Sequence, residues 1–302
     1  MDKRIRIGII GAGVFGNYHA NKCTDNPHVD FVGVYDVDNI RAAQVAAKHG
    51  VTIFETFGDM LADVEAVIIS CCAKHHGQMA LQALQKGCHC LIEKPLAATL
   101  DDAQKILDLS HEDLIVQAGH QERFVVRAIG LLDIPETPKA IRAFRLGKYS
   151  QRGTDVSVTL DLMSHDLDLV LWLMGEFPHE VIGKTEKVHS KSADIANARL
   201  EFKAGYAELT ASRAAGEFRR TMEIAYPSGT VHVDFNAKSL THNTPFDLDI
   251  DFATNPTASD SLGAATDSFV ESILRGVPIA ISAQDGYDAV KLALMIDSDG
   301  EA

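Results

Sequence analysis

The feature that most constrains this chain is a glycine-rich loop directly behind its first apolar run. Residues 5–10 read IRIGII, which is typical of a buried strand, and glycines in a GxGxxG pattern follow it and open a helical segment. In such loops the first glycine permits a tight turn, the second lets the backbone approach a pyrophosphate, and the third lets helix and strand pack closely. The helix N-terminus then faces the phosphates. We therefore predict a dinucleotide-binding loop that consists of Gly11, Gly13, Val14, Phe15 and Gly16.

An acidic residue at the end of the next apolar run indicates which dinucleotide binds. Asp36 follows the last glycine of the loop by about 20 residues, the usual distance for a carboxylate that accepts hydrogen bonds from the adenosine ribose hydroxyls. A carboxylate there repels a 2′-phosphate, and Asp38 adds a second negative charge. Arg41, close by, could accommodate a 2′-phosphate. On balance the pattern predicts NAD, rather than NADP, as the cofactor.

The order of apolar runs predicts two domains of different architecture. In residues 1–120 short strand-like runs alternate with helical patterns, which implies parallel strands with helices on both faces. Beyond them come an apolar helix over residues 159–174 and then consecutive strand-like runs with period-two alternation, typical of an antiparallel sheet. We therefore predict an α/β fold, with an N-terminal Rossmann domain (a doubly wound parallel sheet) over residues 1–120. A C-terminal α/β domain with an open, mostly antiparallel sheet is expected over residues 121–302.

Composition excludes several classes of function. The net charge of −14 argues against a nucleic-acid binder, which needs a basic surface to neutralise phosphates. The longest apolar stretches are far shorter than the roughly 20 residues that span a bilayer. Glycines interrupt the apolar run behind Lys3 and Arg4, so we expect a strand there and not a signal peptide.

The cysteines also bear on the class of protein. They form no CxxC pair, so we expect buried thiols and no metal site. Reduced thiols without an export signal predict a cytoplasmic protein. The cysteines are Cys23, Cys71, Cys72, Cys88 and Cys90.

A lysine stands where a later strand of the first domain ends. The run Cys90-Leu91-Ile92 continues into Glu93-Lys94-Pro95, and the carboxyl ends of parallel strands face the ligand crevice. A lysine there can hold a substrate hydroxyl and stabilise the alkoxide that forms during hydride loss. Pro95 fixes the turn and allows a cis peptide bond. By itself, the tripeptide fits an ordinary surface lysine better than a functional one.

Together with the upstream glycine loop, this tripeptide resembles the Gfo/Idh/MocA family of oxidoreductases (glucose–fructose oxidoreductase, inositol dehydrogenase and relatives). Residues 267–276 (DSFVESILRG) and 282–286 (SAQDG) are also similar to the family. The resemblance implies a Rossmann domain and a second domain whose open sheet commonly serves oligomer contacts. We therefore expect a homo-oligomer, a dimer or a tetramer, that forms through the open sheet.

The chain departs from the family in one place. After the third strand the family usually carries Thr-Pro-Asn-x-x-His, whereas residues 71–76 read CCAKHH, so that only His76 matches. The backbone of this stretch can still serve the cofactor. The resemblance implies that Cys71, His76, Glu93 and Lys94 border the nicotinamide half of the cofactor.

The apolar helix carries a candidate general base. Asp161 and His165 are four residues apart and Asp168 follows three later, so a helix places all three on one face. Histidine suits proton transfer because its pKa lies near neutrality. The acids could instead serve the helix dipole or act as structural partners, and no further cluster completes a metal site. With Lys94, the family pattern implies His165 as the base and Asp161 as the residue that positions the substrate.

Two stretches bear on the substrate. Residues 119–124 (GHQERF) and 152–163 (RGTDVSVTLDLM) resemble the family branch that acts on nucleotide sugars. The expected reaction is oxidation of the 3-hydroxyl of a UDP-N-acetylglucosamine-type sugar. Two alternative functions remain: an inositol or free-sugar dehydrogenase, and a non-catalytic NAD-sensing protein of the same fold. The residues that we expect to meet the diphosphate, or else to be solvated surface charges, are Arg123, Lys148, Tyr149 and Arg152.

Overall fold

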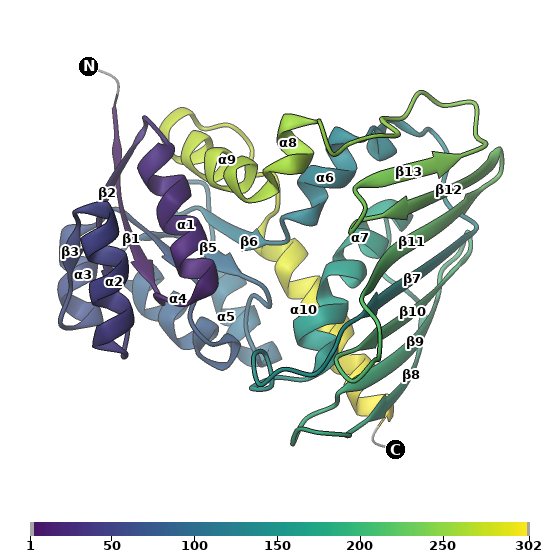
Figure 1. Cartoon of the computed structure of the whole chain (residues 1–302), viewed down its shortest axis with the longest axis horizontal. Helices are drawn as coiled ribbons and strands as arrows, with labels where there is room; N and C mark the ends of the chain where they lie inside the picture. Colours follow the sequence, from purple (N-terminus) through teal and green to yellow (C-terminus); the bar gives the residue numbers. More distant parts are fainter. Residues whose placement is uncertain (1–2, 301–302) are drawn as a thin grey trace. The chain divides into compact units, whose positions relative to one another are not determined.

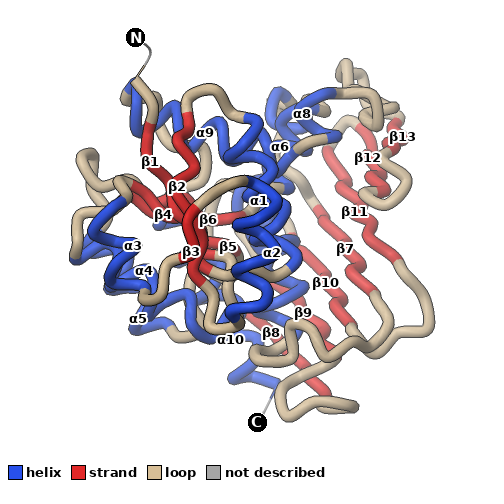
Figure 2. Tube along the Cα trace, turned by 60° about the vertical axis from the view of Figure 1, so that its left-hand side comes forward, coloured by secondary structure: helices blue, strands red, loops and turns tan. Residues whose placement is uncertain are grey.

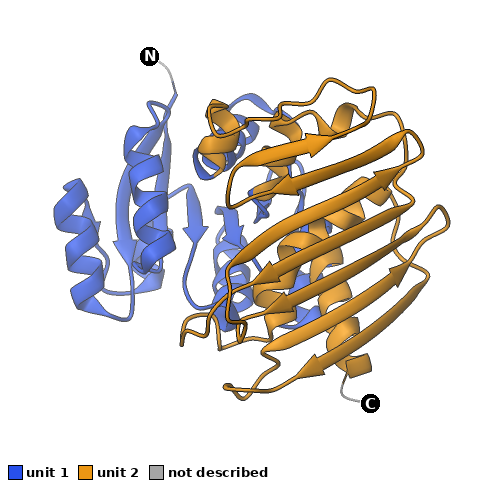
Figure 3. Cartoon of the chain, turned by 45° about the vertical axis from the view of Figure 1, so that its right-hand side comes forward, with its two compact units in different colours: residues 1–121, 262–287 blue, residues 122–261, 288–302 orange. Residues whose placement is uncertain are grey.

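The structure is a computed structural model that describes residues 3–300. The chain divides into two compact units (Figure 3). Unit 1 contains residues 1–121 and 262–287, and unit 2 contains residues 122–261 and 288–302. Each unit is built on its own sheet.

The sheet of unit 1 has, among the described residues, six strands in the order β3-β2-β1-β4-β5-β6, and every pair is parallel. The chain runs outward from β1 to β3 and then crosses to the other side of β1, so the order reverses between β1 and β4. Ligands bind outside the strand carboxyl ends at such a switch point. The strands are β1 (Ile5–Ile10), β2 (Val29–Tyr35), β3 (Thr52–Ile53), β4 (Ala66–Ile69), β5 (His89–Glu93) and β6 (Val116–Gly119).

Helices cover both faces of this sheet, which confirms the doubly wound prediction. In Figure 2, α1 and α2 lie on one side of the strands and α3, α4 and α5 on the other. Their N-termini are defined by short polar side chains: Asp38 caps α2, Thr56 caps α3 and Thr99 caps α5. The helices are α1 (Val14–Asp25), α2 (Asn39–His49), α3 (Phe57–Asp63), α4 (His76–Gln85), α5 (Leu100–Leu109) and α9 (Ser261–Arg275), with a 3₁₀ turn, η1 (Ala73–His75).

The helix α9 shows where the expected domain boundary differs from the structure. Residues 262–287 were assigned to a second domain over 121–302, but they cluster with unit 1. Phe269 and Val270 are buried in the same core as Ile7 and Ile9, and the Gln117 side chain donates a hydrogen bond to the Ala265 carbonyl at 2.8 Å. These residues belong to unit 1 because the apolar face of α9 completes the core beside β1, although α9 and β1 lie far apart in the sequence.

Unit 2 is built on a mixed sheet, in the order β13-β12-β11-β7-β10-β9-β8 among the described strands (Figure 1). All pairs are antiparallel except β7 with β10, so the sheet is mostly antiparallel as predicted. The strands are β7 (Ala140–Leu146), β8 (Glu180–Glu186), β9 (Ile195–Glu201), β10 (Tyr206–Ser212), β11 (Arg219–Tyr226), β12 (Gly229–Asp234) and β13 (Ser239–His242).

Burial alternates along these strands, because one face of the sheet is covered by helices and the other is open. The expected single helix over residues 159–174 is in fact two pieces, a π-helical turn followed by an α-helix, α7. No helix within residues 3–300 is long and apolar enough to cross a membrane. The remaining elements are α6 (Glu122–Ala128), η2 (Leu131–Asp133), η3 (Thr159–Met163), α7 (Ser164–Met174), α8 (Pro256–Ser259) and α10 (Ala283–Gly300).

The packing of α9 predicts a stability effect. Replacing the buried Phe269 by Ala removes a ring from the core of unit 1 and should cost about 3–5 kcal/mol of unfolding free energy. The matched change Phe218→Ala, at a side chain that is 69% exposed, should leave stability nearly unchanged. Denaturant unfolding of both variants measures the difference. Equal midpoints would show that α9 does not complete this core.

Candidate functional site

The glycine loop lies at the switch point between β1 and β4, and its glycines have different reasons to be glycine. A Cβ on Gly11, whose φ is +96°, would lie 2.6 Å from the backbone nitrogen of Cys71, and a Cβ on Gly16 would lie 1.8 Å from the carbonyl oxygen of Gly11. Around Gly13, the N-cap of α1, no atom of the described residues beyond its own neighbours in the chain lies within 4 Å of that position. Packing therefore requires two of the glycines, and the third leaves open space at a helix N-terminus, where a pyrophosphate fits.

Asp36 is held beside this loop, at the end of β2. Its Oδ2 accepts a hydrogen bond from the Ala12 backbone N–H at 2.6 Å, and its Oδ1 accepts one from the Asp38 N–H at 2.8 Å. Arg41, which could have favoured a 2′-phosphate, has its Nε 3.1 Å from Asp38 on the solvent-exposed start of α2. Because Asp38 already pairs with Arg41, the carboxylate of Asp36 is the negative group nearest the loop, an arrangement suited to ribose hydroxyls.

The stretch that departs from the family pattern is organised by His76. This ring is buried, with Nδ1 2.7 Å from the Pro95 carbonyl oxygen and Nε2 3.1 Å from that of Cys71. Burial lowers the pKa of His76 below its ordinary value, so the neutral ring donates to one of the two carbonyls at a time. In this hydrogen bond Cys71 contributes its backbone carbonyl and not its side chain. A cysteine can therefore replace the residue that the family usually has at this position.

Glu93 carries a buried charge beneath the Lys94 turn. Its Oε1 accepts a hydrogen bond from Nε2 of His19, on α1, at 2.9 Å, and both side chains are buried. Burial by itself raises the pKa of Glu93, but the hydrogen bond from His19 and the nearby Lys94 lower it below its ordinary value. The pair ties the helix of the phosphate loop to the end of β5. Lys94 is half-buried, and the Lys94–Pro95 peptide bond is cis.

In unit 2, Asp161 lies within the π-helical turn η3 and His165 in the first turn of α7, and both are half-buried. A π turn is wider than an α turn and is frequent at functional sites. Asp168, expected beside His165, is instead buried against Arg123, which donates to it through Nε at 2.8 Å and Nη2 at 2.7 Å. Glu122 brings a carboxylate near His165, with its Oε1 3.9 Å from the histidine Nδ1.

Glu122 is fixed by a buried arginine that sequence reasoning missed. Nη2 of Arg145 lies 2.6 Å from Glu122 and 2.8 Å from Asp166. Burial by itself lowers the pKa of Arg145, but the two carboxylates raise it above its ordinary value, so the guanidinium stays charged. Arg145 thus holds the Glu122 carboxylate close to His165. In the sequence, the only signal that could have indicated a role for Glu122 is its position inside the family-like stretch GHQERF.

The four expected substrate residues separate into two groups. Arg123 is buried, pairs with Asp168 and stacks over the Trp172 ring at 5.3 Å, so we leave it out of the substrate site. The other three are exposed on residues 147–158, the segment between β7 and η3. A Cβ on Gly153 would lie 2.3 Å from a carboxylate oxygen of Asp161, so this segment packs directly on Asp161. The three are Lys148, Tyr149 and Arg152.

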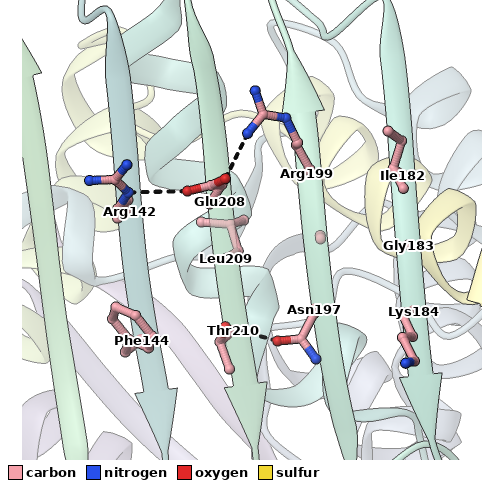
Figure 4. A pocket seen from close by; sticks show the side chains of 11 residues that line it. Arg142, Phe144, Ile182, Gly183, Lys184, Asn197, Arg199, Glu208, Leu209 and Thr210 are labelled. Carbon is pink, nitrogen blue, oxygen red and sulfur yellow. Dashed lines mark hydrogen bonds and ion pairs between the residues drawn. The ribbon is translucent and has the colours of Figure 1, made fainter.

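The open face of the sheet in unit 2 carries a shallow depression of about 380 Å³ (Figure 4). Glu208 lies at its centre, 3.1 Å from Nε of Arg142 and 2.6 Å from Nη1 of Arg199. Phe144 and Ile182 add apolar surface. None of the candidate cofactor or catalytic residues lines this depression, which belongs to the face expected to make oligomer contacts.

Comparison with known proteins decides the family. Residues 5–120 match the model described as "Oxidoreductase family, NAD-binding Rossmann fold", and residues 138–232 match the GFO/IDH/MocA C-terminal domain. The chain belongs to the Gfo/Idh/MocA family. It is accordingly an NAD-dependent oxidoreductase, as the glycine loop and Asp36 predicted.

Relatives within the Gfo/Idh/MocA family include two kinds of dehydrogenase. A UDP-N-acetylglucosamine 3-dehydrogenase of Acidithiobacillus ferrooxidans is 32% identical, over 97% of this chain and 96% of that enzyme. A solved structure of the same enzyme, GnnA, has a TM-score of 0.89 and covers 99% of this chain and 98% of its own. An inositol 2-dehydrogenase of Burkholderia vietnamiensis is 28% identical, over 65% of this chain and 62% of its own length.

The fold extends to more distant members of the family. GenD2 from gentamicin A biosynthesis, solved in complex with NAD, is 20% identical and has a TM-score of 0.85 over 99% of this chain and 95% of its own. This likeness shows the fold alone. Within residues 3–300 no group of three or more His, Cys, Asp or Glu side chains could hold a metal ion.

The different surroundings of the loop glycines predict different outcomes on substitution. Gly13→Val should weaken NAD binding by roughly tenfold or more, about 1.4 kcal/mol, and leave the melting temperature unchanged, because its side chain meets no protein atom. The matched change Gly16→Val should destabilise the fold itself, because the Gly11 carbonyl already occupies the space. Calorimetric NAD titration and thermal unfolding separate the two effects. Unaltered NAD affinity in Gly13→Val would contradict this placement of the pyrophosphate.

Proposed function

We propose that this Gfo/Idh/MocA enzyme oxidises the 3-hydroxyl of a UDP-N-acetylglucosamine-type nucleotide sugar to a ketone. The observation that carries the proposal is the packing of the segment 147–158 on Asp161, because it brings the cationic side chains of Lys148 and Arg152 to the segment that holds a candidate catalytic residue. Cations so placed suit the diphosphate of a nucleotide sugar. The similarity over the full length to a UDP-N-acetylglucosamine 3-dehydrogenase supports the same substrate.

Four residues carry the proposed chemistry. His165 takes the proton of the substrate hydroxyl, the ammonium group of Lys94 stabilises the alkoxide that forms, and Asp161 positions the sugar. Glu122, 3.9 Å from Nδ1 of His165, stabilises the imidazolium that results. When bound, NAD supplies the acceptor for the hydride that leaves the carbinol carbon. In the reverse direction His165 returns the proton.

The cofactor residues follow from the geometry of unit 1. The open space at Gly13 takes the pyrophosphate, and Asp36 binds the adenosine ribose. The His19–Glu93 pair and the His76 hydrogen bonds hold the turn that bears Lys94. The proposed set is Gly11, Gly13, Val14, Phe15, Gly16, Asp36, Cys71, His76, Glu93 and Lys94.

A second candidate function is oxidation of inositol or a free sugar, which the similarity to inositol 2-dehydrogenases favours. That similarity covers 65% of the chain, against 97% for the nucleotide-sugar enzyme. A non-catalytic NAD sensor would not need Lys94, Asp161 and His165, and all three are present.

The proposal extends to assembly and location. The open sheet face, with Phe144 and the exposed Ile182 beside Arg142, Glu208 and Arg199, suits contact with a second copy of the chain, so we propose a homo-oligomer that forms through this face. The five cysteines all lie within the described residues as free thiols, which supports a cytoplasmic enzyme.

The catalytic roles predict a loss of turnover without a loss of cofactor. Lys94→Met and His165→Asn should each lower kcat by roughly 10²–10⁴-fold, the usual contribution of a positioned acid–base group or charge, and leave the Kd for NAD nearly unchanged. Lys203→Met and His179→Asn, at exposed positions, are the matched controls. Steady-state formation of NADH measures kcat. Wild-type turnover in either catalytic variant would overturn its assignment.

The substrate is tested on the wild-type enzyme with UDP-N-acetylglucosamine, UDP-glucose, glucose and myo-inositol. We expect NADH with the nucleotide sugars, and a 2-oxoacid acceptor in the assay reveals turnover even when the cofactor stays bound. Turnover with inositol and none with nucleotide sugars would establish the second candidate instead.

A further inference from the structure

Two irregular segments of unit 2 are held together by one buried ion pair. They are the 147–158 segment and the 187–194 segment, which links β8 to β9. Asp194 and Arg213 are buried, with Oδ1 of the acid 2.8 Å from Nε of the arginine. The other oxygen of Asp194 accepts the backbone N–H groups of residues 188, 189 and 190 at 2.6–2.8 Å. These hydrogen bonds lower the pKa of Asp194 below its ordinary value despite burial. The carboxylate therefore fixes the 187–194 segment.

Arg213 fixes the other segment. Its Nη1 donates to the Gly153 carbonyl, and its Nη2 donates at 2.9 Å to the carbonyls of Val156 and Ala193. Surface loops rarely contain a buried charge pair, since burying charges is costly unless every donor and acceptor is satisfied. Here the pair fixes both loops through its hydrogen bonds, and loops fixed on a scaffold commonly bind ligands.

The ion pair brings two exposed rings together, one from each segment. The rings of Tyr149 and His189 lie with centroids 4.7 Å apart, and Tyr149 is 41% exposed. The backbone N–H of His189 is one of the three that Asp194 binds. An exposed pair of rings on a fixed backbone is a surface on which a planar base can stack.

The same two segments are locally basic on an acidic chain. They carry Lys148, Arg152, Lys187 and Lys191 against a single acid of the exposed parts, Asp155, while the chain as a whole has a net charge of −14. Gly153 follows Arg152 directly, and a Cβ on it would meet the carboxylate of Asp161. Along the 147–158 segment and into η3, Tyr149 is followed by Arg152 and then by the candidate catalytic acid, Asp161. A nucleotide sugar has the matching order of base, diphosphate and sugar.

We propose that the Tyr149–His189 pair is the base-stacking subsite for the uracil of the nucleotide-sugar substrate, with the cations of the two segments on its diphosphate. The inference rests on the proposed function, since it assigns the nucleotide half of that substrate. In this arrangement Tyr149 contacts the base, and not the diphosphate as expected from the sequence. Arg213 is then a positioning residue, which acts through the two segments that it holds.

Binding of UDP and of inorganic pyrophosphate tests the subsite. Titration calorimetry is carried out with excess NADH, so that the dinucleotide site is filled. Tyr149→Ala should weaken UDP binding on the order of tenfold, as loss of a stacked ring does, and leave pyrophosphate binding unchanged. Tyr149→Phe keeps the ring and should bind UDP like the wild type. Arg152→Gln should weaken the binding of both UDP and pyrophosphate. The matched control Lys203→Gln, at a side chain that is 87% exposed, should weaken the binding of neither.

Each result decides the inference. UDP binding that is equal in Tyr149→Ala and wild type, or absent in the wild type, would overturn the subsite, and an unchanged melting temperature shows that a variant is folded. The outcome is separate from that of the proposed function. UDP binding by stacking without oxidation of any nucleotide sugar would contradict the proposed reaction alone, whereas oxidation with unaltered UDP affinity in Tyr149→Ala would contradict the subsite alone.

Discussion

The close approach of backbone to backbone at the switch point of the parallel sheet determines the rest of the cofactor site. Gly16 packs so tightly on the carbonyl of Gly11 that only glycine fits, and Gly11 in turn packs on the backbone of Cys71. These contacts fix α1 against β1 and β4, so its N-terminus opens toward solvent at Gly13. The site is therefore built mainly from backbone, which is why the side chains at residues 71 and 72 can differ from the family pattern.

Buried polar pairs position side chains in both units. His19 with Glu93 supports the Lys94 turn, Arg145 with Glu122 supports the surroundings of His165, and Arg213 with Asp194 holds two surface segments. Breaking either of the two arginine ion pairs by removing one partner costs about 3–5 kcal/mol, while the intact pair adds little net stability. Their value is in fixing one arrangement of polar groups, and each pair joins residues that are distant in sequence.

Much of this organisation could be predicted from local patterns. Apolar runs of four or more residues gave the strands β1, β2, β4, β5 and β6, and the glycine loop with Asp36 gave the cofactor. The strand β3 has no local pattern because it has two residues, and β7 and β13 have weak ones because their alternation of apolar and polar residues is interrupted or short. Neither the packing of α9 on unit 1 nor the partner of Arg123 has a local signature, because both depend on contacts between distant segments. The π turn at Asp161 likewise has no local signature in the sequence.

In the proposed reaction the enzyme removes hydride from carbon 3 of a nucleotide-bound sugar. The most direct measurement uses UDP-N-acetylglucosamine with deuterium at carbon 3 and follows the label into the reduced cofactor by mass spectrometry. We expect singly deuterated NADH and a 3-keto sugar that has lost its label. Unlabelled NADH, with the deuterium retained in the oxidised sugar, would contradict it.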